Sequence, residues 1–416
     1  MNANKLKIIV TASTYPRWED DGVPMFVHDQ LVFLKKNYPQ IDITLLAPHH
    51  LGARKVEPSD FGTIRRFQYF YPARYQQLVY PAIMPNLRNN KWLYLQLPFF
   101  MFFQFIALLV LVLKNKPDYI YSHWFIPQGI VGGLVSLITA TKHVYTSHSS
   151  DVIIAQKIPL LGPLLVRFLT KHSKKVTVVS QRSRAKLESF FSAQDWQLIE
   201  SKIQIIPMGV DTTSFGKALA SKNELKEKYG YKGRNILFFI GRLSEKKGVE
   251  YLLDALLQYQ ETDHSVLLVV AGDGPLMGSL KHKSENLGLT NVIDFIGYTS
   301  GIKKLELFKM GDVLILPSII AEDGDAEGFP VVLMEGLASG KLCIATDVSG
   351  ADDVLSSGQD GFLINQKSSD EILEALNTIN SLSDEEKDSI SKNAARKSKK
   401  FDWNNIVKQH VEHLFE

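Results

Sequence analysis

The sequence predicts an α/β protein built from two doubly wound domains, and three observations support this prediction. The 416 residues exceed the size at which one hydrophobic core usually keeps growing, which favours two domains of roughly 200 residues. Short β-branched runs alternate with helical patterns along the whole chain, as in the βαβ units that build parallel sheets. Residues 206–215 combine proline, glycine and short polar side chains, as expected of a hinge at mid-chain.

The predicted strands fall into two sets, each sufficient for one doubly wound sheet. We expect strands at residues 7–11, 41–46, 119–123, 142–146, 176–180 and 203–206, and then at 236–240, 265–271, 292–297, 313–317, 342–346 and 361–364. Residues 1–207 are predicted to form an N-terminal domain and residues 208–400 a C-terminal domain. The amphipathic segment 401–416 is expected to form a last helix that packs back on the N-terminal domain.

The composition excludes several classes of protein. With 45% hydrophobic and 22% charged residues the chain is expected to fold, and a net charge of +3 argues against a nucleic-acid partner. The one cysteine, Cys343, lies in an apolar run, so we expect a buried strand thiol rather than a disulfide or a cysteine metal site. The N-terminal residues enter a predicted strand almost at once, which leaves no room for a signal peptide and predicts a cytoplasmic protein.

Two segments raise the question of a membrane. Residues 99–113 are apolar enough for a transmembrane helix, but a crossing there would separate two strands of the first sheet, 7–11 and 119–123. We therefore expect a buried helix, with partial exposure at a membrane interface as the main alternative and a true span as the lesser one. Residues 152–187 contain eight basic residues and no acidic one, which predicts either a solvated helix face or attraction to an anionic membrane surface.

A basic loop follows one strand of the second half, in Phe238-Phe-Ile-Gly-Arg-Leu-Ser-Glu-Lys-Lys-Gly248. Arg242 and Lys247 lie just beyond the carboxyl end of the strand, where open α/β sheets bind ligands. Arginine offers a planar fork for phosphate oxygens and lysine a point charge, and a leaving diphosphate needs such groups to neutralise its developing charge. We expect a diphosphate here, with an ordinary basic surface loop as the alternative.

Two carboxylates flank a predicted helix start in Glu327-Gly-Phe-Pro-Val-Val-Leu-Met-Glu335. Pro330 suits the first helical position, because its missing N–H would be unpaired there. The free amides of the helix N-terminus favour a phosphate. Glu327 on the loop could accept hydrogen bonds from sugar hydroxyls, and Glu335 inside the helix could hold both hydroxyls of a ribose. Two surface glutamates without a ligand are the alternative.

Together these motifs resemble glycosyltransferase family 4, a retaining family with the two-domain GT-B fold, in which two Rossmann-like domains face each other across a cleft. Members carry Gly-Arg-Leu, a lysine a few residues on, and two glutamates separated by seven residues. The resemblance covers nearly the whole chain: Gly272-Asp-Gly-Pro275 resembles a family turn, and Ile206-Pro-Met-Gly-Val-Asp211 resembles the hinge, with Met208 where Asn is usual. Pro317-Ser318 followed by residues 322–330 is most similar to the exopolysaccharide branch, including colanic acid-type transferases.

The resemblance implies a role for each motif residue. Arg242 and Lys247 would bind the donor diphosphate, Glu327 would act at the donor sugar as a catalytic residue, and Glu335 would bind the nucleotide ribose. Tyr145-Thr-Ser-His-Ser-Ser-Asp151 resembles the family's His-x-x-Asp, so His148 would be catalytic and face the reacting sugar. Asp151 either touches substrate or orients its loop, and His123 is a weaker candidate on the acceptor side.

The loop at residues 13–24 departs from the paired glycines usual in the family. Gly22 is its only glycine and the one position at which the backbone could approach the diphosphate. Arg17, Trp18 and Glu19 of the same loop could meet an acceptor sugar.

The expected activity is transfer of a sugar from a UDP- or GDP-linked donor to a saccharide acceptor, lipid-linked in view of the apolar and basic segments. The sequence offers no obvious nucleophile paired with a base, so we favour front-face substitution with retention of configuration. No cofactor is expected and no metal, although Asp323-Gly-Asp325 is a possible cradle. A nucleotide-sugar epimerase and a non-catalytic carbohydrate-binding protein are the alternatives, whereas a dinucleotide oxidoreductase should show Gly-x-Gly-x-x-Gly after its first strand.

Overall fold

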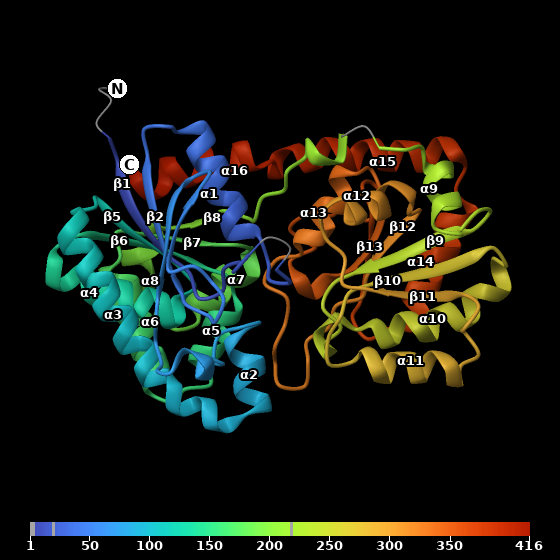
Figure 1. The fold of residues 1–416 in the computed structure, drawn as a ribbon. Helices are drawn as coiled ribbons and strands as arrows, with labels where there is room; N and C mark the ends of the chain where they lie inside the picture. The colour runs from blue at the N-terminus through green and yellow to red at the C-terminus, as the bar shows by residue number, and fades with distance from the viewer. Residues whose placement is uncertain (1–4, 19–20, 217–218) are drawn as a thin grey trace. The chain divides into compact units, whose positions relative to one another are not determined.

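The computed structural model describes residues 5–18, 21–216 and 219–416, and these form two compact units. One unit comprises Met1–Pro207 and Trp403–Glu416, and the other comprises Met208–Asp402. Each unit is a mainly parallel sheet covered by helices on both sides (Figure 1), so the predicted α/β fold class with two Rossmann-like domains is confirmed. The last fourteen residues belong to the first unit, and the chain therefore starts and ends in the same domain.

The sheet of the first unit has the order β3-β4-β2-β1-β5-β6-β7-β8, and only β3 runs antiparallel to its neighbour. Its strands are β1 (Lys7–Thr11), β2 (Asp42–Pro48), β3 (Val56–Ser59), β4 (Gly62–Phe67), β5 (Tyr119–His123), β6 (Lys142–Ser147), β7 (Lys175–Val178) and β8 (Ile203–Ile205). The sequence analysis missed β3 and β4. β3 is an exposed edge strand with Pro58 in it, and β4 carries two arginines, so neither shows a plain apolar pattern.

The helices of the first unit cover its sheet on two sides (Figure 1). They are α1 (Phe26–Asn37), α2 (Ile83–Asn89), α3 (Gln96–Asn115), α4 (Ile130–Thr139), α5 (Ser150–Gln156), α6 (Leu161–His172), α7 (Gln181–Glu188), α8 (Ala193–Ile199) and α16 (Trp403–His410). α16 packs against α1, where Trp403 stacks on Phe33. The chain then ends in the turn Val411–Phe415, and the Tyr119 hydroxyl donates to the carbonyl of Phe415 at 3.1 Å.

Helix α3 contains the apolar segment 99–113, and only one side of it is buried. Phe100, Leu108 and Val112 join the core beneath the sheet, whereas Phe102 and Val110 are exposed. The expectation of a buried helix is therefore wrong for the outward side. Within the described residues, Lys91–Asn115 is the one helix long and apolar enough to cross a membrane, by length and composition alone. The strands before and after it, β4 and β5, lie in one sheet.

The second unit has the strand order β11-β10-β9-β12-β13-β14, all parallel. Its strands are β9 (Asn235–Ile240), β10 (Val266–Ala271), β11 (Ile293–Gly297), β12 (Val313–Leu316), β13 (Leu342–Thr346) and β14 (Phe362–Ile364). Its helices are α9 (Lys222–Lys228), α10 (Val249–Thr262), α11 (Met277–Asn286), α12 (Gly301–Met310), α13 (Val331–Ala338), α14 (Ser369–Ser381) and α15 (Asp384–Ser398). Cys343 is fully buried in β13, as predicted, and burial raises the pKa of its thiol.

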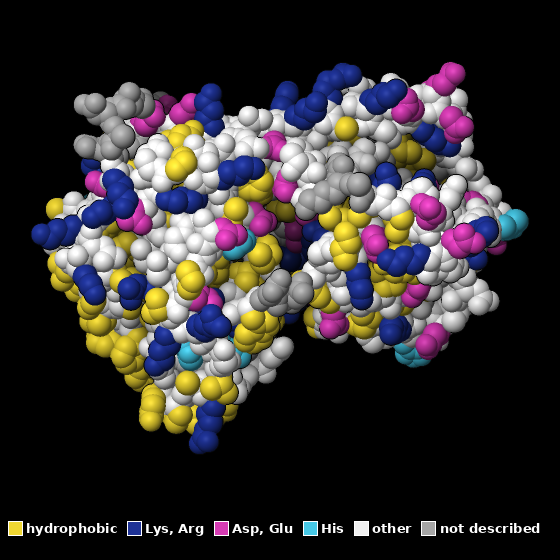
Figure 2. Space-filling view, turned by 45° about the horizontal axis from the view of Figure 1, so that its top comes forward, with side chains coloured by type: hydrophobic (Ala, Val, Ile, Leu, Met, Phe, Trp, Pro, Cys, Tyr) yellow, Lys and Arg dark blue, Asp and Glu magenta, His cyan; other side chains and the backbone are white. Residues whose placement is uncertain are grey.

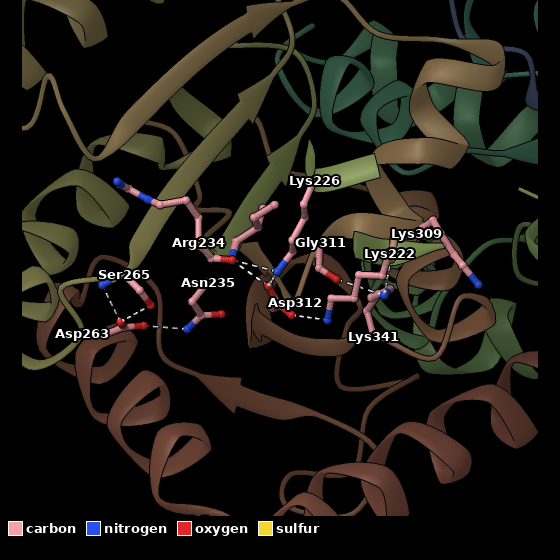
Figure 3. Close-up of polar contacts among 11 residues, drawn as sticks. Lys222, Lys226, Arg234, Asn235, Asp263, Ser265, Lys309, Gly311, Asp312 and Lys341 are labelled. Carbon is pink, nitrogen blue, oxygen red and sulfur yellow. Dashed lines mark hydrogen bonds and ion pairs between the residues drawn. The ribbon is translucent and has the colours of Figure 1, made fainter. Parts of the chain in front are cut away.

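A network centred on Asp312 ties α9 to the amino edge of this second sheet (Figure 3). The Asp312 carboxylate accepts hydrogen bonds from the ammonium groups of Lys222 and Lys226 and, at 2.8 Å, from the Ile236 amide at the start of β9. Lys341, before β13, donates to the carbonyl of Gly311 at 3.0 Å, and burial lowers its pKa to about 8. The network lies at the strand ends opposite to the loops that carry Arg242 and Glu327, so we expect it to stabilise the fold rather than to contact a ligand.

We expect Asp312→Asn to weaken the second unit by about 3 kcal/mol, because it leaves two lysines without their shared carboxylate. Burial raises the pKa of Asp312, but Lys222 and Lys226 outweigh it and the net shift is downward. A carboxyl with a lowered pKa stabilises the fold at neutral pH, and this contribution is lost as the pH falls through the folded-state pKa. Hydrogen exchange of β9 peptides should show the difference at pH 7 and its disappearance in acid.

Asp388→Asn is the matched control for this measurement. Asp388 pairs with Lys392 on the exposed surface of α15, and such pairs contribute less than about 1 kcal/mol. Equal protection of the β9 amides from hydrogen exchange in Asp312→Asn and in the wild-type protein would show that the network does not stabilise the second unit.

Candidate functional site

The loop that carries Arg242 and Lys247 follows β9 at the carboxyl edge of the second sheet. It makes a short 3-10 turn, Glu245–Lys247, and enters α10 through Gly248. Gly248 has a φ of +61°, and a Cβ atom there would lie 2.0 Å from the carbonyl oxygen of Pro317 after β12. Only glycine allows this approach. The loop is thereby held against the segment that leads to Glu327.

The loop after β10 holds the β9 loop from its other side. A Cβ atom at Gly272 would lie 1.8 Å from the carbonyl oxygen of Gly241, so the two backbones touch. The Leu243 amide donates to the carbonyl of Asp273 at 2.9 Å, and the Leu276 amide donates to the carbonyl of Leu243 at 3.1 Å. The backbone around Arg242 is therefore fixed, while its side chain is exposed at the strand ends.

Glu327 pairs with both lysines of the β9 loop. Its carboxylate lies 3.1 Å from Nζ of Lys247 and 3.8 Å from Nζ of Lys246, and Lys246 also lies 3.4 Å from Asp325. Burial raises the pKa of Glu327, but the two lysines outweigh it and the net shift is downward, so the group is ionised at neutral pH. Sequence reasoning did not single out Lys246, although its place beside Lys247 was a signal.

Glu335 lies in the second turn of α13 and is largely buried. One of its oxygens is 2.5 Å from Nζ of Lys304 on α12, and the other, Oε2, has no hydrogen-bond partner among the described residues. Pro330 is the N-cap of α13 rather than its first residue, because the helix begins at Val331. No motif pointed to Lys304, which reaches Glu335 only through the fold.

In the first unit, His148 follows β6 and lies against His123 of β5. The Nε2 atom of His148 is 3.2 Å from Nδ1 of His123, and the His148 ring packs on Trp124 and Phe26. Burial, reinforced by His410, lowers the pKa of His148 to about 3, and burial and His148 hold the pKa of His123 well below its ordinary value. Both rings are neutral near pH 7, so each can donate one hydrogen bond and accept another.

Asp151 orients its loop rather than facing solvent. Its carboxylate is buried and accepts hydrogen bonds from the Phe125 amide at 2.5 Å, the Ser147 hydroxyl at 2.9 Å and the Val152 amide at 3.0 Å. Burial raises the pKa of Asp151 despite these bonds. Since both oxygens are engaged, Asp151 links the segments after β5 and β6 and positions His148.

The loop after β1 places Arg17 in a bidentate pair with Asp21. Nε and a terminal nitrogen of Arg17 lie 2.8 and 2.7 Å from the two Asp21 oxygens, and the guanidinium packs on Trp18 and Tyr80. Gly22 is exposed, and a Cβ atom there would meet nothing within 4 Å, so nothing in the fold of the chain itself requires glycine. Glu19 lies outside the described residues.

The second unit thus brings Arg242, Lys247, Glu327 and Glu335 to the helix starts and loops along one edge of its sheet, where Lys247 pairs with Glu327 and Lys304 with Glu335. Such an edge can neutralise a phosphate group and accept hydrogen bonds from hydroxyls. Asp325, half of the possible metal cradle, is paired with Lys246. His148, His123 and Asp151 form a separate cluster in the first unit.

Comparison with known proteins covers both units. The family described as Glycosyltransferase Family 4 matches residues 22–214, and the family described as Glycosyl transferases group 1 matches residues 221–397. An Escherichia coli UDP-Gal:alpha-D-GlcNAc-diphosphoundecaprenol alpha-1,3-galactosyltransferase is 27% identical over 282 residues, 65% of this chain and 68% of that protein. The putative colanic acid biosynthesis glycosyltransferase WcaL of E. coli K12 is 29% identical over 200 residues, 47% of this chain and 46% of that one. The solved structure of Anabaena HepE in complex with UDP and glucose superposes with a TM-score of 0.71 at 19% identity, covering 99% of both chains.

Proposed function

Because the chain belongs to the glycosyltransferases that join a family 4 domain to a group 1 domain, as its motifs predicted, we propose that it transfers a sugar from a nucleoside diphosphate sugar to a saccharide acceptor with retention of configuration. The observation that carries the proposal is the pairing of Lys247 with Glu327 beside Arg242. These groups supply positive charge for a diphosphate and a fixed carboxylate for sugar hydroxyls on one loop cluster. Glu335, whose buried Oε2 atom has no hydrogen-bond partner in the part of the chain that the structure describes, offers an acceptor for ribose hydroxyls.

Transfer with retention of the anomeric configuration and without a covalent intermediate requires little more than the charged groups of this loop cluster. The bond between the anomeric carbon and the diphosphate oxygen breaks, and the acceptor oxygen bonds to that carbon from the same face. The acceptor proton passes to the leaving diphosphate oxygen. Lys247 and Arg242 would stabilise the negative charge that develops on the diphosphate. Neutral His148 would hold the sugar by a hydrogen bond rather than act as an acid, in keeping with its lowered pKa.

We further propose a UDP-linked donor and a lipid-linked saccharide acceptor in the synthesis of a surface polysaccharide. The E. coli galactosyltransferase uses UDP-Gal and an acceptor on diphosphoundecaprenol, and WcaL is assigned to colanic acid biosynthesis, which support this choice. A GDP-linked donor is the alternative within the same proposal. The cytoplasmic location expected from the sequence is also part of it.

The test is a thermal-shift and hydrolysis screen of the purified protein against UDP- and GDP-sugars. We expect one donor to raise the melting temperature and to be hydrolysed slowly, and Arg242→Ala and Glu335→Ala to abolish both responses. Arg396→Ala, a change on the exposed surface of α15 in the same unit, should leave them intact. No response to any donor would favour a non-catalytic carbohydrate-binding protein.

The products formed from the donor that responds, with and without acceptor, identify the type of reaction. An acceptor-dependent product with the donor's anomeric configuration, seen by proton NMR, supports retaining transfer. Conversion of the donor into a second nucleotide sugar without acceptor would instead show an epimerase. We expect activity to persist in EDTA, since side chains can neutralise the diphosphate; loss on chelation and recovery with magnesium would overturn metal independence.

A further inference from the structure

The exposed side of α3 is apolar, and its buried side contains polar groups. Six exposed side chains line it: Phe99, Phe102, Phe103, Ile106, Val110 and Leu113. Gln96 and Gln104 point inward, and their Oε1 atoms have no hydrogen-bond partner among the described residues. The rest of the buried side is apolar, at Phe100, Leu108, Leu111 and Val112, so α3 is apolar on both sides, whereas a helix that faces water is polar on its outer side. The outward side of α3 therefore suits a nonaqueous environment.

Two neighbouring helices extend this side into a broad surface. Val131 and Val135 of α4 share a core cluster with α3, and a Cβ atom on Gly133 of α4 would lie 2.5 Å from Leu169 of α6, so the three helices pack in sequence. The exposed apolar side chains of α4 are Leu134, Leu137 and Ile138, and those at the start and along α6 are Leu160, Leu161, Leu164 and Phe168. We call the exposed apolar side chains of α3, α4 and α6 the apolar face. Figure 2 shows hydrophobic side chains gathered along the lower left of the first unit, where Figure 1 labels α3 and α4.

Basic residues predominate in the part of the chain that forms the apolar face. Residues 61–187 contain sixteen lysines and arginines but only two acidic residues, Asp118 and the buried Asp151. Exposed basic side chains stand just before α3, at Lys91, and in its last turn, at Lys114, whereas Lys171 on α6 pairs with Asp195 at 2.7 Å. A protein partner would be expected to meet an apolar patch with a rim of mixed charge. Basic side chains at both ends of a helix rich in exposed leucine and phenylalanine match an anionic lipid surface.

The topology decides how such a surface would meet a bilayer. β4 leads into α3 and β5 follows it, and both strands belong to the same sheet. A helix that crossed the bilayer would place these strands on opposite sides. A bilayer that contacts α3 would therefore have to lie along the helix and could not be crossed by it.

We propose that the apolar face docks in the plane of an anionic phospholipid bilayer, with its phenylalanines and leucines among the acyl chains and the lysines at both ends of α3 at the headgroups. The docking does not depend on the identity of the donor. It deepens the proposed function, because it would hold the first domain at the surface where a lipid-linked acceptor resides.

The test is cosedimentation of the full chain with vesicles of phosphatidylcholine alone and of an equimolar mixture with phosphatidylglycerol. We expect binding to the mixed vesicles that weakens with salt. The triple variant Phe102→Gln/Phe103→Gln/Ile106→Gln should bind at least about 100-fold more weakly, because three exposed side chains lose their transfer into lipid. Lys91→Gln/Lys114→Gln should bind roughly 25-fold more weakly, about fivefold per lysine. All five positions are exposed, so the fold should survive.

The matched control is Val56→Gln/Ile302→Gln, which removes two exposed apolar side chains outside the apolar face and should bind as the wild-type protein does. Absence of wild-type binding to both vesicles would overturn the proposal, as would equal binding by the triple variant. Sedimentation equilibrium without lipid would test the other occupant of the face. A wild-type protein that is dimeric and a triple variant that is monomeric would show that a second copy of the chain covers the face instead. Vesicle binding needs no sugar donor, so its failure would leave the proposed transfer reaction untouched.

Discussion

Lys247→Ala should lower kcat for sugar transfer about 1000-fold, with a much smaller loss of nucleotide affinity. Gly248 holds the loop of Lys247 against the carbonyl of Pro317, and the Lys247 ammonium group lies 3.1 Å from Glu327, so its charge is in place before the donor binds. A prearranged charge acts most strongly where charge develops during the reaction, here on the leaving diphosphate. Transfer assays under saturating donor, with UDP affinity from calorimetry, would separate the two effects.

Lys246→Ala is the control for charge alone, because Lys246 adjoins Lys247 and also pairs with Glu327. We expect kcat to fall about tenfold or less, since solvent partly screens the charge of Lys246. Lys247→Arg should restore part of the activity. Equal losses in kcat for the two alanine variants would mean that Lys247 serves only the general charge of the loop.

The strands of the two sheets could be predicted from the sequence because parallel strands are continuous apolar runs. All twelve predicted strands are present, with ends displaced by two residues at most. β4 was missed because Arg65 and Arg66 interrupt its apolar pattern, and the fold accommodates Arg66 by pairing it with Glu57 and the carbonyl of Pro16. Such compensation comes from distant parts of the chain and leaves no local signal.

The candidate site likewise contains residues that the sequence could predict and residues that only the fold reveals. Arg242, Lys247, Glu327 and Glu335 could be placed because loops after parallel strands meet at one edge of a sheet. The partner of Glu335, Lys304, lies on a helix thirty-one residues earlier and carries no motif. Asp151 could not be assigned from sequence because its role depends on a hydrogen bond to the Phe125 amide on the neighbouring strand's loop.

The apolar segment of α3 shows a limit of hydropathy itself. A run of phenylalanine and leucine predicts removal from water, but a protein core and a lipid phase satisfy it equally. The positions of Gln96 and Gln104 would have been informative, because both occur on the side of the helix that the structure buries. Their inward placement became visible only once the helix was set against the sheet.

Glu335→Ala should raise the donor KM about 100-fold, because it removes the carboxylate that we propose as the acceptor for ribose hydroxyls, and a hydrogen bond to a charged group contributes about 1.5–3 kcal/mol. Donors that lack one ribose hydroxyl should bind the wild-type enzyme more weakly. The same donors should lose nothing further in Glu335→Ala, because the partner of the missing hydroxyl is already gone.

Lys304→Met separates this ribose contact from a structural role of the Lys304–Glu335 pair. The carboxylate remains in Lys304→Met but loses its partner at 2.5 Å, so we expect a KM increase of roughly tenfold with the sensitivity to deoxy donors retained. If the loss of a ribose hydroxyl weakens donor binding equally in Glu335→Ala and in the wild-type enzyme, Glu335 does not contact the ribose. Its buried Oε2 atom would then have another partner, and the assignment of the nucleotide pocket to the start of α13 would have to move.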